Sequence, residues 1–149
     1  MIALALASRR QLRHWADSES HWAPCVAVSP GAALAHNNLA NALRAKGRLP
    51  RALAHYRKAL SLEPTTPQMR QNLGSALLEA VPYYENALKA APSSPETRLN
   101  LAETHFALGA ALDRAGQSGQ AAEHFERAIK ARPDHAKAHN NLGVILARR

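Results

Sequence analysis

The sequence has few of the residues that build disulfide scaffolds, membrane spans or catalytic centres. It contains one cysteine in 149 residues, so no internal disulfide can form. Aromatic residues make up 5% of the chain, and the N-terminal apolar run, residues 1–7, is far shorter than the ~20 residues of a membrane span. A Gly-rich phosphate loop, a serine-nucleophile context and paired carboxylates are all missing. We therefore expect no enzyme activity, no catalytic residue and no cofactor.

Acidic residues are also scarce, because 19 Lys and Arg face 11 Asp and Glu, for a net charge of +8. An acidic partner is thus worth considering. The basic residues are scattered along the chain, so nucleic acid is not a predicted partner. Among the eight histidines, His135 and His139 are four residues apart, as two metal ligands on one helical face would be. No Cys or carboxylate at ligand spacing supports them, and no metal site is predicted.

The sequence does contain a repeated pattern. Between Ala102 and Pro133, two amphipathic segments flank a polar break at residues 116–119, and Pro133 ends the second segment. That segment has an aromatic residue, a small residue and a proline at fixed spacing, and this triplet occurs as Phe125/Ala128/Pro133, Tyr84/Ala87/Pro92, Tyr56/Ala59/Pro64 and, more loosely, Trp22/Cys25/Pro30. A first-segment signature recurs at intervals of 34, 35 and 34 residues, as Leu39-Ala40, Leu73-Gly74, Leu108-Gly109 and Leu142-Gly143.

A period of roughly 34 residues with these residues resembles the tetratricopeptide repeat (TPR) family, from about His14 onward. The usual first-helix Trp is replaced by His36, Arg70, His105 and His139. The resemblance implies an all-α fold, an α-solenoid of antiparallel helix pairs (a TPR superhelix) with about three and a half repeats. We expect a single TPR domain over residues 1–149, divided into a half-repeat (1–30), repeat 1 (31–64), a shortened repeat 2 (65–94), an extended repeat 3 (95–135) and a capping helix (136–149).

The second repeat is irregular. Pro64 and Pro92 are 28 residues apart, whereas Pro92 and Pro133 are 41 apart. The first helix should end near Ala80 and the second begin at once, which leaves two interpretations: a strained tight turn, or a short loop absent near Ala80-Val81 and visible as a chain break. The lack of turn residues favours the missing loop. The seven extra residues of the next repeat should lengthen its first helix to residues 95–115 without changing its buried face.

The N-terminus allows two interpretations as well. Residues 1–7 are apolar and are followed by Arg9, Arg10 and Arg13. They form either a packed helix running to about Trp15 or the end of a transmembrane helix with basic residues at the membrane surface. Residues 10–20 resemble the junction in bacterial membrane proteins that have a C-terminal TPR domain after a glycosyltransferase-like region. Cytoplasmic and membrane-attached locations therefore both stay open, as does an extension upstream of Met1.

Asparagine is the feature that suggests a binding site. Asn38, Asn72 and Asn141 directly precede the first-helix signature, and Asn100 precedes a further Leu-Ala pair, Leu101-Ala102. In TPR proteins the first helices line a concave groove. A side-chain amide both donates and accepts hydrogen bonds, so it can bind the backbone of an extended peptide. The pattern resembles the asparagine ladder of protein O-linked N-acetylglucosamine transferases. The predicted peptide-binding residues are Asn37, Asn38, Asn41, Arg44, Gln71, Asn72, Ser75, Asn100, Asn140 and Asn141.

An alternative is that these asparagines cap or link neighbouring first helices. Arg44, Arg70 and Arg98 could add carboxylate-binding donors on the same face. The sequence thus predicts a non-catalytic protein-interaction scaffold that binds an extended peptide in an Asn-lined groove, with an acidic peptide as one candidate. The alternative function is self-assembly, as a homo-oligomer through the terminal helices, or service as a regulatory TPR appendage of a membrane glycosyltransferase-like protein. Neither the ligand's identity nor the oligomeric state follows from the sequence.

Overall fold

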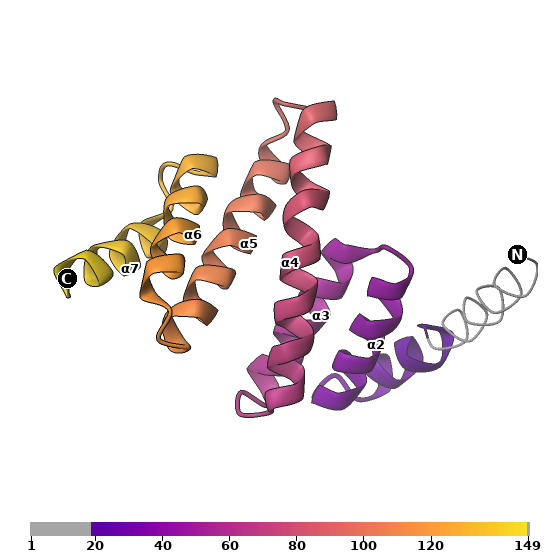
Figure 1. The fold of residues 1–149 in the computed structure, drawn as a ribbon. Helices are drawn as coiled ribbons and strands as arrows, with labels where there is room; N and C mark the ends of the chain where they lie inside the picture. Colours follow the sequence, from indigo (N-terminus) through magenta and orange to yellow (C-terminus); the bar gives the residue numbers. More distant parts are fainter. Residues whose placement is uncertain (1–18, 149) are drawn as a thin grey trace, which may run out of the picture. The chain divides into compact units, whose positions relative to one another are not determined.

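The computed structural model describes residues 19–148, and every regular element in that range is a helix. Helical residues 19–28 are followed by α2 (Ala33–Ala45), α3 (Leu49–Leu62), α4 (Pro67–Ala90), α5 (Pro95–Arg114), α6 (Ser118–Ala131) and α7 (Ala136–Ala147) (Figure 1). The predicted N-terminal helix and most of the membrane-protein junction lie outside the described residues. The chain divides into two compact units, Met1–Ala76 and Leu77–Arg149, and α4 belongs to both.

In the first unit, α2 and α3 form a helix pair with an alanine- and leucine-rich interface. Leu43 and Tyr56 are fully buried there, and the Tyr56 hydroxyl donates a 2.6 Å hydrogen bond to Asn41 Oδ1. The start of α4 joins this pair through Met69, which packs with Ala33 and Ala59. The first two helices of the repeat thus leave an apolar face that the next helix covers.

An ion-pair cluster attaches helical residues 19–28 to the turn after α2. The Glu19 carboxylate accepts hydrogen bonds from Lys46 Nζ at 2.6 Å and from an Arg48 guanidinium nitrogen at 2.9 Å. The hydrogen bond from Lys46 is the main reason that the pKa of Glu19 lies below its ordinary value.

The same turn closes the helix pair in both units. Gly47 and Gly116 have φ angles of 71° and 76°, a region that residues with a Cβ rarely adopt. In each turn the following residue donates its N–H back across the helix end, from Arg48 to the Leu43 carbonyl and from Gln117 to the Leu112 carbonyl, both at 2.9 Å. This satisfies carbonyls that the end of a helix would otherwise leave unpaired.

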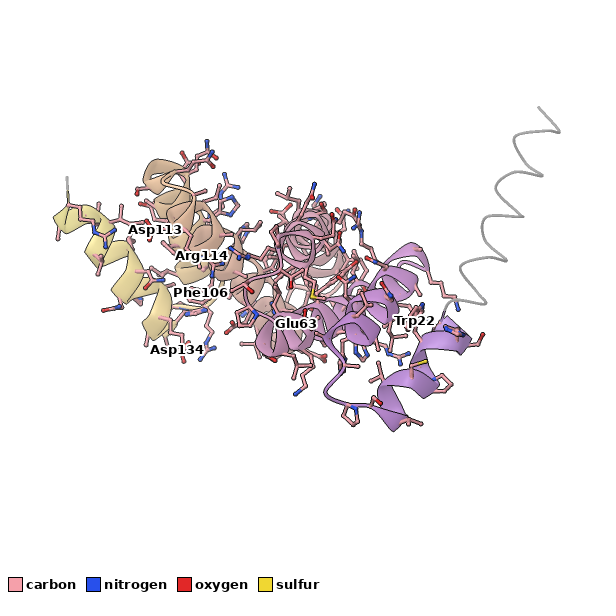
Figure 2. All side chains as sticks on the ribbon, turned by 90° about the horizontal axis from the view of Figure 1, so that it is seen from below. Trp22, Glu63, Phe106, Asp113, Arg114 and Asp134 are labelled. Carbon is pink, nitrogen blue, oxygen red and sulfur yellow. The ribbon has the colours of Figure 1, made fainter. Side chains whose placement is uncertain are left out.

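In the second unit, α5 and α6 form the equivalent pair and α7 covers one side of it. α5 begins as predicted, with Ser94 Oγ accepting the Thr97 N–H at 3.3 Å and Pro95 in the first turn. Phe125 is fully buried in a cluster with small residues of α6 and with Ile145 of α7. Its neighbour Phe106, labelled in Figure 2, lies with its ring centroid 5.8 Å away.

The prediction for the shortened second repeat is wrong. We expected two helices meeting at residues 79–81, with a chain break there, but α4 continues without interruption from Pro67 to Ala90 (Figure 1). Pro82 lies inside this helix and removes one backbone hydrogen bond, which costs about 3 kcal/mol. A turn at this point would forgo several helical hydrogen bonds without a glycine to cap either end, so the chain stays helical.

Gly109 allows the close approach of α5 to α6. A Cβ placed there would lie 2.8 Å from Phe125 Cε1 and 3.1 Å from the Ala121 carbonyl oxygen. We predict that Gly109→Leu lowers the free energy of unfolding by about 1–3 kcal/mol, the usual cost of overpacking. Gly143→Leu is the matched control, because nothing lies within 4 Å of a Cβ at that position. Urea unfolding followed by circular dichroism measures both, and equal stability of the two variants would contradict the prediction.

Candidate interaction surface

Four side-chain amides form a hydrogen-bonded series across α2 and α4, which we call the amide chain. Asn37 Nδ2 donates to Asn38 Oδ1 at 3.4 Å, Asn72 Nδ2 donates to Asn37 Oδ1 at 3.0 Å, and Gln68 Nε2 donates to Asn72 Oδ1 at 3.0 Å. Within this series Asn38 uses only its oxygen and Gln68 only its nitrogen. Each end therefore retains the opposite group for a further hydrogen bond.

The structure brings three of the predicted groove residues into the amide chain, namely Asn37, Asn38 and Asn72. Asn37 is only 5% exposed, so its role is largely to link the first helices of two successive repeats. Asn41 likewise serves packing by accepting the Tyr56 hydroxyl. The linking role that the sequence offered as an alternative is thus correct for Asn37, while Asn38 is half-buried.

The other predicted groove residues lie outside the amide chain. On α2 and α4, Arg44 and Ser75 are half-buried and Gln71 is exposed. On α5 and α7 of the second unit, Asn140 is exposed, whereas Asn100 and Asn141 are half-buried. Sequence reasoning missed Gln68, although its spacing of four residues from Asn72 predicts that two helical side chains meet.

The second unit contains a cleft of about 600 Å³ that sequence reasoning did not predict. Its charged residues are mainly basic, because Arg98, Arg127 and Lys130 outnumber Glu85, the acidic residue there. Leu88, Leu101, His105, Ala131 and Pro133 complete the lining. Because Arg127 and Lys130 are three residues apart, the sequence predicts that these two cations lie on one face of a helix. Their position opposite Arg98 depends on the packing of α5 against α6.

His36 and His139, two of the residues that replace the usual first-helix Trp, anchor their helices to the preceding turn. His36 Nε2 lies 3.1 Å from the Pro30 carbonyl oxygen, and His139 Nε2 lies 2.8 Å from that of Pro133. In α5 this contact is made by Arg98, whose guanidinium donates to the Pro92 carbonyl at 2.6 Å. His36 and His139 thus have a structural role at the helix entry, whereas His105 pairs with His124.

Two histidine pairs connect first to second helices. The Nδ1 atoms of His36 and His55 lie 2.9 Å apart, and those of His105 and His124 lie 3.1 Å apart. Burial lowers the pKa of His105 to about 4, with smaller contributions from the His124 imidazole and the Arg127 guanidinium. Burial also lowers the pKa of His55 and of His124. A neutral imidazole has one N–H donor and one acceptor nitrogen, so the two rings of a pair can share one hydrogen bond.

Residues 19–148 contain no group of three or more side chains placed to hold a metal ion. His135 is instead the N-cap of α7, where its Nδ1 accepts the Ala138 N–H at 3.3 Å, and its ring stacks on Phe106 with centroids 5.0 Å apart. Within the same range, no helix combines the length and the apolar character that crossing a bilayer requires.

Paired helices closed by a glycine turn, each anchored to the turn before it, define a helical-repeat protein of the class that binds other proteins. Tetratricopeptide repeat profiles match residues 33–66 and 69–134, which is more than half of the chain. The chain therefore belongs to the tetratricopeptide repeat family, and the predicted all-α TPR fold class is confirmed. No protein of curated function gives a significant match.

Solved structures with similar folds include TPR proteins at low sequence identity. MamA from Desulfovibrio magneticus RS-1 is 24% identical, with 97% of this chain and 82% of that chain covered and a TM-score of 0.43. YrrB, described as a TPR protein with an unusual peptide-binding site, is 19% identical, with coverages of 93% and 87% and a TM-score of 0.40. PilF of Pseudomonas aeruginosa is 22% identical, with coverages of 99% and 66% and a TM-score of 0.45.

The buried His105 predicts acid sensitivity. Its pKa in the folded chain is about 4, below the ordinary 6.5, so the unfolded chain binds more protons between these values. The stabilisation is complete above pH 6.5 and is lost as the pH falls towards 4, by roughly 1–3 kcal/mol. Thermal unfolding at pH 7.5 and 4.5 should show a smaller loss for His105→Gln than for the wild type. His21→Gln, at an exposed site, is the control; an unchanged loss in His105→Gln would refute the prediction.

Proposed function

We propose that this chain is a non-catalytic scaffold that binds an extended peptide segment of a partner protein. The TPR fold supports the general role of a protein-interaction scaffold. The observation that supports the peptide is the amide chain, because it aligns donors and acceptors of two first helices. An extended backbone offers the same alternation of N–H and C=O groups, so such a site binds it without reading its side chains.

The proposed contact residues are the ends of the amide chain, Asn38 and Gln68, together with Gln71, exposed on the same helix as Gln68. Asn37 and Asn72 position them. Removal of the Asn72 side chain would leave Asn37 Oδ1 buried without its donor, at a cost of about 1–3 kcal/mol, so Asn72→Ala would mix stability with binding. The end residues allow a cleaner test.

Replacement of both ends tests the peptide site. We predict that Asn38→Ala plus Gln68→Ala weakens binding of a labelled Gly-Ser-Gln repeat peptide by about 5–10-fold, the loss expected for roughly one net hydrogen bond. Fluorescence anisotropy measures the affinity, and the melting temperature should stay unchanged. Gln120→Ala removes an exposed amide on α6 and serves as the control. If the double variant binds as tightly as the wild type, the amide chain is not the peptide site.

The basic cleft supports a preference for acidic segments. Arg98, Arg127 and Lys130 face a space of about 600 Å³ with Glu85 as their counter-charge. A peptide carboxylate there would gain charge-assisted hydrogen bonds, most favourably from the planar arginine side chains. Arg98 is already oriented by its bond to the Pro92 carbonyl, so Arg127 and Lys130 are the exposed cations available for recognition.

Charge removal at the cleft tests this preference. We predict that the wild type binds a Gly-Ser-Glu repeat peptide more tightly than the Gly-Ser-Gln peptide of equal length, and that added salt removes the difference. Arg127→Gln plus Lys130→Gln should abolish the discrimination, whereas Lys137→Gln, an exposed cation outside the cleft lining, should preserve it. The preference is assigned wrongly if the cleft variant still discriminates as the wild type does.

A further inference from the structure

An apolar pocket of about 530 Å³ lies between helical residues 19–28 and the start of α2. Its lining residues are apolar apart from one serine, and none carries a charge: Trp22, Pro24, Cys25, Val28, Ser29, Ala32, Leu34 and Ala35. The pocket is open in the single chain, because Val28 is 84% exposed and Leu34 is 59% exposed. It is therefore a different kind of site from the basic cleft of the second unit.

Leu34 is not a residue that the repeat itself requires. It lies five residues before Leu39 of the first-helix signature. The equivalent positions of α4, α5 and α7 hold Gln68, Glu103 and Lys137. All three are polar, so the packing of a helix pair does not depend on an apolar side chain at this position. An exposed leucine in an apolar pocket of this size is instead typical of a binding site for an apolar group.

The pocket adjoins the amide chain on α2. Leu34 precedes Asn38 by four residues, so the two side chains lie on one stripe of the helix with their Cβ atoms about 5–6 Å apart. Asn38 is the end of the amide chain that retains its nitrogen for a further hydrogen bond. Side chains on one face of an extended segment repeat roughly every 7 Å. A backbone bound at Asn38 therefore brings the side chain two residues further on above Leu34.

We propose that this pocket binds one large apolar side chain of the partner segment whose backbone the amide chain holds. The inference rests on the proposed function and adds the chemistry of the segment to it. Amides that bind a backbone select neither a sequence nor a register. One leucine, methionine or phenylalanine of the segment sets both, because only one register places that side chain over Leu34.

The partner segment is the occupant that fits best, because the pocket continues the amide chain within one unit. The amide chain runs from α4 to α2, and the pocket lies between α2 and the helical residues before it. Every residue of both sites belongs to the unit Met1–Ala76. Extended peptides are recognised in this way elsewhere, since main-chain hydrogen bonds supply affinity and side-chain pockets supply specificity.

Two labelled peptides of equal length test the proposal by fluorescence anisotropy: the Gly-Ser-Gln repeat, and the same peptide with its central Gln replaced by Leu. The wild type should bind the Leu peptide about tenfold or more tightly than the Gln peptide, as burial of one leucine side chain predicts. Val28→Ser plus Leu34→Ser should bind both peptides alike and melt as the wild type does, because both side chains are exposed. Val144→Ser plus Leu146→Ser, at exposed positions of α7, is the matched control and should keep the preference.

The outcomes separate this inference from the proposed function. A wild type without the preference overturns the inference and leaves the pocket to another occupant, and a pocket variant that keeps the preference overturns it as well. Asn38→Ala plus Gln68→Ala should weaken both peptides by the same factor and preserve the Leu preference. If that variant binds both peptides as the wild type does, while the pocket variant loses the preference, the peptide site on the amide chain is wrong and the pocket binds the side chain alone.

The single cysteine of the chain reports directly on occupancy of the pocket, because Cys25 belongs to its lining. At equal occupancy, the Leu peptide should slow alkylation of Cys25 by iodoacetamide several-fold, whereas the Gln peptide should leave the rate unchanged. Mass spectrometry of the full chain measures both rates. Equal rates with the two peptides, or a free chain in which Cys25 is not alkylated at all, would show that the pocket does not receive the side chain.

Discussion

The contact between a small first-helix residue and a buried aromatic ring determines how each repeat of this chain folds. Gly109 lets Phe125 approach so closely that a single added carbon would collide with the ring. Burial of such a ring contributes on the order of 1.5–3 kcal/mol and makes many dispersion contacts besides. That gain is available only when a turn reverses the chain, which is why the two glycine turns accompany the two closed pairs.

α4 shows what happens when the turn is removed while the contact residues remain. The backbone hydrogen bonds of a continuous helix are the local alternative to tertiary closure, and Pro82 interrupts them at one position only. Local bonding therefore prevails within the single chain. The apolar positions of a closed pair are retained along α4, where Leu77, Ala80 and Tyr84 are buried within the single chain.

Sequence periodicity predicted the helix pairs, the long α5 and the final α7, because repeated small, aromatic and proline residues report directly on helix packing and helix ends. It failed at α4. Without turn residues between Glu79 and Ala80, the chain can either turn or continue as one helix, and which is more stable depends on the hydrogen bonds of the whole helix. Of the amide chain, sequence reasoning found Asn37, Asn38 and Asn72. It missed Arg127 and Lys130, because the cleft they line exists only once α5 and α6 are packed.

His36 holds the Pro30 carbonyl with one ring nitrogen and His55 with the other. In α5, which has the seven-residue extension, two residues make these contacts separately. Arg98 contacts the Pro92 carbonyl and His105 pairs with His124. A side chain that makes only one of these contacts can be replaced by any residue that makes the same contact. A side chain that makes both must satisfy both geometries at once. Across evolutionary time, position 36 should accept far fewer amino acids than position 98 or 105.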